Sequence, residues 1–227
     1  MKPFFIPVLP LLVFLSACSP PDAKKSTEQN PESAAPKTEV LNRVSVGEAD
    51  WSAANLNVSR FADGTEISRA DNLAAFAEFG EMHSPAWCYP DFDPDKGETY
   101  GKLYNWYAVS DPRGLCPAGW RVANADDWAA LTEMAGGPGL AGRALKSSYA
   151  WIGGKEGTDE FGFAALPAGA VSALNGYSAQ GEAAVFWAPE EVSANYAEYR
   201  VIHMSRVGVF LNEDLKMTGM SVRCVRE

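Results

Sequence analysis

Apolar residues recur with two different periods along this chain, and the clearest helical period is centred on Trp128. Trp128, Leu131 and Ala135 lie at the spacing of one helix face. Asn124 precedes them as an N-cap, and Asp127 occupies the third helical position, as in a capping box. Two glycines follow Ala135 and favour the end of a helix. The pattern predicts a helix that begins directly after Asn124.

The other predicted elements are a shorter helix and several strands. Asp71 or Asn72 is suited to cap a helix that runs through Phe79. Runs rich in β-branched and aromatic residues, broken by Gly, Pro and Asn, predict strands. These runs are residues 163–166, 184–188, 198–204, 206–211 and 220–225. One or two helices with several short antiparallel strands late in the chain indicate an α+β domain.

The N-terminus has the pattern of a bacterial lipoprotein signal. Lys2 supplies a positive charge, and an apolar run too short to span a bilayer follows it. Leu-Ser-Ala-Cys at 15–18 is the small-residue pattern of bacterial lipoproteins. Processing cleaves the chain before its cysteine, whose thiol carries the lipid. We therefore expect a signal peptide over residues 1–17 and a lipid on Cys18. The alternative is an ordinary cleaved signal peptide with a chance cysteine.

A tether and one domain are expected after the signal. Residues 18–43 contain no aromatic residue and are rich in Pro, Ser, Lys and Glu, so they cannot form a core and should be a disordered linker. Residues 44–227 have the length of one domain. Ser19, in place of an aspartate, favours an outer-membrane location, with the periplasmic or external side left open.

Charge and candidate chemistry exclude several classes of function. The formal net charge is −10, and an acidic domain repels nucleic acid, so no nucleic-acid partner is expected. His83 and His203 lie far apart in sequence, and no Gly-x-Ser-x-Gly elbow or phosphate-binding glycine loop occurs. We therefore expect no catalytic residues. The alternative is an enzyme whose pocket the sequence does not reveal.

The cysteines after the signal favour a disulfide over a metal site. Cys88, Cys116 and Cys224 would lie in a compartment where disulfides persist. An odd number leaves at least one without a partner in the domain, and the spacing fits no zinc site. The residues themselves leave the pairing open.

An acidic segment allows one cofactor. Asp91, Asp93 and Asp95 alternate in Asp-Phe-Asp-Pro-Asp, and calcium prefers such oxygen ligands. The glycine that follows falls one place late for a helix–loop–helix site. The segment is therefore either a calcium loop or a solvated acidic turn, and no other cofactor is expected.

Short motifs in order across the domain resemble the Fibrobacter succinogenes major paralogous domain family. They include Tyr-Gly-Lys-Leu-Tyr-Asn-Trp at 100–106 and Ser-Val-Arg-Cys-Val at 221–225. The others lie at 51–57, 61–67, 85–89, 93–94, 116–120, 126–128, 145–147, 157–163, 166–169 and 186–187. The resemblance implies a C-type-lectin-like architecture over residues 44–227. A more distant similarity to formylglycine-generating enzymes implies a bridge between Cys116 and Cys224.

Two departures limit what the resemblance implies. Many family members have a second cysteine near the position of Gly97 and Glu98, so Cys88 lacks a local partner here. The reactive cysteine pair of the formylglycine-generating enzymes has no counterpart in residues 195–203, and the lectin-type Glu-Pro-Asn motif is absent. Neither copper-dependent oxidation nor that mode of sugar binding carries over.

The lipoprotein signal, the tether and the resemblance together favour a membrane-anchored envelope lipoprotein that acts as a binding or adhesive module for a polysaccharide or an envelope protein. The alternatives are an enzyme and a structural envelope protein. In C-type-lectin-like domains the late loops form the usual binding face. The candidate ligand residues there are Trp187, Asn195, Tyr196, Arg206, Asn212 and Asp214. Trp187 is expected to reach the surface, whereas Trp106, Trp120, Trp128 and Trp151 are expected in the core.

Overall fold

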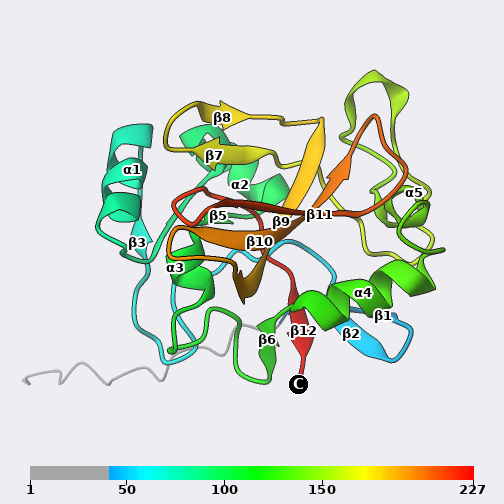
Figure 1. The fold of residues 1–227 in the computed structure, drawn as a ribbon, viewed down its shortest axis with the longest axis horizontal. Helices are drawn as coiled ribbons and strands as arrows, with labels where there is room; N and C mark the ends of the chain where they lie inside the picture. The colour runs from blue at the N-terminus through cyan, green and yellow to red at the C-terminus, as the bar shows by residue number, and fades with distance from the viewer. Residues whose placement is uncertain (1–40) are drawn as a thin grey trace, which may run out of the picture. The chain divides into compact units, whose positions relative to one another are not determined.

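The computed structural model describes residues 41–227 (Figure 1). The signal peptide, Cys18 and nearly all of the expected linker lie outside the described residues. Helices and mainly antiparallel strands are mixed along the described chain, which confirms the predicted α+β class. Among residues 41–227, no helix is both long and apolar enough to cross a bilayer.

A four-stranded antiparallel sheet joins the two ends of the domain (Figure 1). Its order is β1 (Arg43–Val46), β2 (Ala49–Ser52), β12 (Cys224–Arg226) and β6 (Trp120–Val122). The last strand is thus an inner strand, and Val225 pairs with Trp51 of β2 and with Arg121 of β6.

A second antiparallel sheet divides the core. It consists of β9 (Ala183–Glu191), β10 (Tyr196–His203) and β11 (Phe210–Leu215), with β10 in the middle. Side chains alternate between the faces of a strand. Val185 and Trp187 therefore enter one hydrophobic cluster, and Phe186 enters the other. The outer side of β9 is covered, because Trp187 N donates to Ser221 O at 3.0 Å. β11 is left at the open edge.

The remaining elements are short. The strands are β3 (Ser68–Arg69), β4 (Ala86–Cys88), β5 (Leu103–Tyr104), β7 (Ala170–Ser172) and β8 (Gly176–Ser178). The helices are α1 (Leu73–Glu81), α2 (Pro94–Tyr100), α3 (Trp106–Val109) and α5 (Ala141–Leu145), with single 3₁₀ turns at Pro90–Phe92 and Ile152–Gly154.

The predicted capping box is confirmed at the start of α4 (Ala125–Met134). The Asn124 side chain accepts from Asp127 N at 3.0 Å, and the Asp127 carboxylate accepts from Asn124 N at 2.8 Å. Arg121 also pairs with Asp127 and fixes the helix against β6. Gly136 and the glycine after it take positive φ angles and end the helix. The shorter helix α1 is capped by Asn72, one of the two predicted residues.

Three strand predictions need correction. Residues 163–166 form no strand: Phe163 is buried in the core, and only Ala165 makes a bridge, to Lys146. The run predicted at 206–211 becomes a strand only from Phe210, because Val207 and Val209 before it are bound to Arg143 of α5 and to Pro138. The run predicted at 220–225 shortens to Cys224–Arg226, since Met220 and the serine after it make isolated bridges.

Aromatic side chains fill the core. Trp51, Trp128, Phe163 and Phe186 pack around one another with ring centroids 5.1 to 6.2 Å apart. Of the tryptophans expected in the core, Trp106, Trp128 and Trp151 are buried and Trp120 is half-buried.

The Arg side chain of the Ser-Val-Arg-Cys-Val motif is also structural. Arg223 is fully buried and donates to Ser52 O at 2.7 Å, to Asn55 Oδ1 at 2.9 Å and to Ala164 O at 3.1 Å. A buried charge is tolerated when its donors are satisfied in this way. Arg223 thus ties the end of the chain to two earlier segments.

The implied disulfide is present between Cys116 and Cys224, which are 108 residues apart in sequence. Cys88 on β4 is a buried free thiol. The bridge therefore closes most of the domain, and the odd cysteine lies inside the core.

Candidate functional site

The structure separates the six predicted ligand residues into three groups. Trp187 is buried, with no exposed surface, and its indole N–H donates to Tyr104 O at 3.0 Å and to Thr218 O at 3.2 Å. The expectation that Trp187 reaches the surface is wrong. The ring is packed in the buried cluster that contains Tyr104 and Met220, so it does not reach solvent.

Three predicted residues lie at one end of the β10–β11 hairpin. Asn195 and Tyr196 are exposed at the β9–β10 turn. The Asp214 carboxylate accepts from Leu215 N at 2.7 Å and from the Thr218 hydroxyl at 3.4 Å. Asp214 is therefore engaged in local bonds, whereas the Tyr196 ring is accessible.

Arg206 and Asn212, the other two, line a cleft on β10, β11 and the loop that connects them. We call it the hairpin cleft, and its volume is about 540 Å³. Its lining residues are Val201, His203, Ser205, Arg206, Val209, Phe210, Leu211 and Asn212. Clefts of ~300–1,000 Å³ with an apolar lining and a few polar groups are typical of small-molecule sites. No carboxylate lines this one.

The histidine of the cleft is held in one tautomer. Ser205 N donates to His203 Nδ1 at 3.2 Å, and the Ser205 hydroxyl lies 2.8 Å from the same atom. Because a ring nitrogen that accepts from a backbone N–H carries a lone pair, the neutral ring has its proton on Nε2. His203 therefore offers a hydrogen-bond donor to the cleft.

The contact between the Ser205 hydroxyl and His203 resembles the nucleophile–base contact of a catalytic serine. An activated serine also needs a third group that orients the histidine. Among residues 41–227, nothing hydrogen-bonds to Nε2 of His203, and Ser205 N already occupies Nδ1. The pair serves as a local cap at the end of β10.

The cationic residue of the cleft is unpaired within the described chain. The Arg206 guanidinium lies 5.0 Å from the centre of the Phe210 ring, and no carboxylate of residues 41–227 forms an ion pair with it. Its planar N–H groups are free to bind an anion from outside the domain.

The loop of the cleft is anchored from below. The buried Lys146 donates to Arg206 O at 3.0 Å and to Met204 O at 3.4 Å. Arg143 N donates to Val207 O at 3.1 Å, and Val209 N donates to Pro138 O, also at 3.1 Å. These bonds fix the backbone that carries the cleft residues.

The three acids of the candidate calcium segment do not come together in the structure. Asp91 pairs with Lys96, and the Asp93 side chain caps α2 by accepting from Asp95 N at 3.0 Å. Within residues 41–227, no three acidic, His or Cys side chains come together as metal ligands require. The acids act as turn and cap residues, because Pro94 starts a helix at this point.

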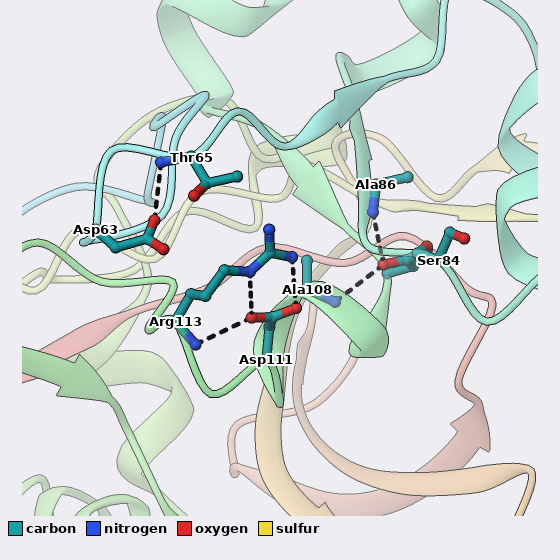
Figure 2. Close-up of polar contacts among 8 residues, drawn as sticks. Asp63, Thr65, Ser84, Ala86, Ala108, Asp111 and Arg113 are labelled. Carbon is teal, nitrogen blue, oxygen red and sulfur yellow. Dashed lines mark hydrogen bonds and ion pairs between the residues drawn. The ribbon is translucent and has the colours of Figure 1, made fainter.

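A second polar cluster, shown in Figure 2, lies where two turns meet. Arg113 donates to the Asp111 carboxylate through Nε at 2.8 Å and a terminal nitrogen at 2.7 Å. These bonds lower the pKa of Asp111, and the backbone N–H of Thr65 lowers the pKa of Asp63. The acids are satisfied within their own turns, which are joined by a bond from Ala62 N to Gly114 O at 2.8 Å, and the cluster offers no open site.

Sequence reasoning missed the apolar side of the cleft and His203. The signal was present, because His203 and Phe210 flank a short loop of small and cationic residues. It did not identify His203 as a site residue, because a histidine inside a predicted strand is most often structural.

The structure thus defines an α+β domain closed by a disulfide, with a cationic cleft at the end of its late hairpin. A family model, described as Fibrobacter succinogenes major domain, matches residues 44–226, so the chain belongs to that family. No curated protein and no solved structure matches the chain significantly.

Proposed function

We propose that this protein is a binding module of the bacterial envelope and that the hairpin cleft is its ligand site. One observation carries the proposal: Arg206, Asn212 and His203 line one cleft, and within residues 41–227 the Arg206 guanidinium forms no ion pair and His203 Nε2 forms no hydrogen bond. The apolar residues beside them supply surface that a bound ligand would cover and remove from water. A polysaccharide or an envelope protein is the ligand class that fits this location.

We propose further that the domain has the C-type-lectin-like architecture. The bridge between Cys116 and Cys224 supports it, because that bridge was implied by the same resemblance. The presence of the first and last strands in one sheet also supports it. In that architecture the late loops bind ligands, and the hairpin cleft belongs to them.

The envelope location rests on the sequence. Cys18 in its Leu-Ser-Ala-Cys context supports lipid attachment, and Ser19 supports sorting to the outer membrane. Three acyl chains on this cysteine would exceed the two signals that stable anchoring needs. The tether would then hold the domain close to the bilayer.

Binding can be tested with the full chain on arrays of polysaccharides and envelope proteins. The double variant Arg206→Ala and Asn212→Ala should lose the binding that the wild type shows. The matched control is Asn195→Ala with Tyr196→Ala, which changes the opposite end of the same hairpin and should retain binding. Loss in the control variant alone would move the site away from the cleft.

A further inference from the structure

The arginines of residues 41–227 divide into two groups. Most of them pair with a carboxylate, as expected in a domain with excess acid. The exceptions among the described residues are Arg143, Arg206 and Arg223, and Arg223 is buried in the core. The two exposed exceptions are neighbours in the fold, because Arg143 N donates to Val207 O.

Further positive charge lies under the same loop. Lys146 donates to Arg206 O and is buried. In a chain with a formal net charge of −10, cationic groups therefore gather around one loop and leave its arginine without a partner.

We propose that the hairpin cleft recognises the carboxylate of an acidic saccharide, a hexuronate residue, with Arg206 as the carboxylate ligand. This inference rests on the proposed binding function and specifies its ligand. A guanidinium binds a carboxylate through two parallel hydrogen bonds. His203 Nε2–H and the Asn212 amide serve the sugar hydroxyls, and the half-buried Phe210 contacts the apolar face of the ring.

The charges along the hairpin favour a sugar over an acidic peptide. An extended peptide would add to the open edge of β11 and run past Glu213 and Asp214. Those carboxylates repel an acidic chain, whereas a uronate ring occupies only the cationic end of the strand. The occupant that fits both the volume and the charges is a short acidic saccharide.

The cleft is rigid before the ligand arrives. A Cβ added to Gly208 would come within 2.2 Å of Pro138 O, and one added to Gly142 within 2.4 Å of Gly208 O. The loop thus lies directly on the backbone at α5, which only glycine allows. A loop packed in this way loses little backbone order on binding, which favours selectivity from an ion pair.

The test is calorimetry of the full chain with trimers of galacturonate, mannuronate and guluronate. Each acidic trimer is compared with its methyl ester, which keeps the rings and removes the charge. At least one acidic trimer should bind ~10-fold or more tightly than its ester, and added salt should weaken it. Arg206→Gln should abolish this preference. The control Arg226→Gln, a surface arginine on β12, should keep it.

Two outcomes would overturn the inference and leave the binding function intact. One is that the acidic trimer and its ester bind with equal affinity, or that wild type and Arg206→Gln bind the acidic trimer with equal affinity. In either case the double variant of Arg206 and Asn212 would still have to lose the ligand. The other is binding of tetraglutamate while every uronate trimer fails. If no saccharide or envelope protein binds in a cleft-dependent way, the proposed function itself is wrong.

Discussion

Lys146 Nζ lies 3.0 Å from the carbonyl oxygen of Arg206, so a buried lysine holds the backbone of the exposed arginine in the cleft. The Lys146 ammonium also lies 4.8 Å from the centre of the Trp151 ring. The position of Arg206 therefore depends on a side chain that no ligand touches.

Replacement of Lys146 by methionine should weaken both stability and binding. The change keeps the apolar stem but leaves the carbonyls of Met204 and Arg206 without this donor, at a cost of about 1–3 kcal/mol. Urea denaturation should show that loss, and calorimetry should show weaker ligand binding. Arg206→Gln is the control, since it should reduce binding with unchanged stability. Unchanged stability of Lys146→Met would contradict the anchoring role.

Loss of the Cys116–Cys224 bridge should destabilise the domain. Its loop spans 108 residues, and closing so long a loop contributes up to about 4–5 kcal/mol by restricting the unfolded chain. Cys116→Ser should therefore lower the free energy of unfolding by a few kcal/mol, measured by urea denaturation. Peptide mapping that finds Cys88 in a disulfide would refute the pairing.

Cys88 should resist thiol reagents in the folded protein. The thiol is buried, and desolvation raises its pKa well above the ordinary range. A raised pKa keeps the thiol protonated at neutral and mildly alkaline pH, and the thiolate is the reactive form. Iodoacetamide should label Cys88 only after unfolding without reductant, as read by mass spectrometry. Rapid labelling of the native protein would show that the strand opens.

Trp187 and Tyr196 should respond differently to truncation. Trp187 is fully buried with its N–H bonded, so Trp187→Ala should cost about 3–5 kcal/mol of stability. Tyr196 is 41% exposed, and Tyr196→Ala should change the melting temperature little. Thermal denaturation of both variants is the measurement, and equal destabilisation would show that Tyr196 belongs to the core.

Cys18 should carry the lipid. Cys18→Ser should move the protein from the membrane fraction to the soluble fraction, because the acyl chains provide the anchor. The intact mass of the mature protein decides the matter. A mature chain that begins after Cys18 without acylation would end the lipoprotein proposal.

Local features could be predicted from the sequence, and non-local ones could not. The capping box at Asn124 depends on residues three apart, so the start of α4 followed from the sequence alone. The burial of Trp187 depends on Ser221, and the shape of the cleft depends on contacts between Val207 and the helix that carries Arg143. These contacts join segments that are distant in sequence, and the spacing of apolar residues along the chain does not predict them. The Cys116–Cys224 pairing followed only from the family resemblance.

The inner position of β12 has a consequence for the order in which the chain folds. β2 and β6 are joined only through this strand, which is the last strand of the domain. Cys224 of the same strand supplies one half of the disulfide. A growing chain can form its helices and its β9–β10–β11 sheet early, but the four-stranded sheet and the covalent bridge form only after β12 has been made. A chain truncated before Cys224 has neither the complete four-stranded sheet nor the bridge.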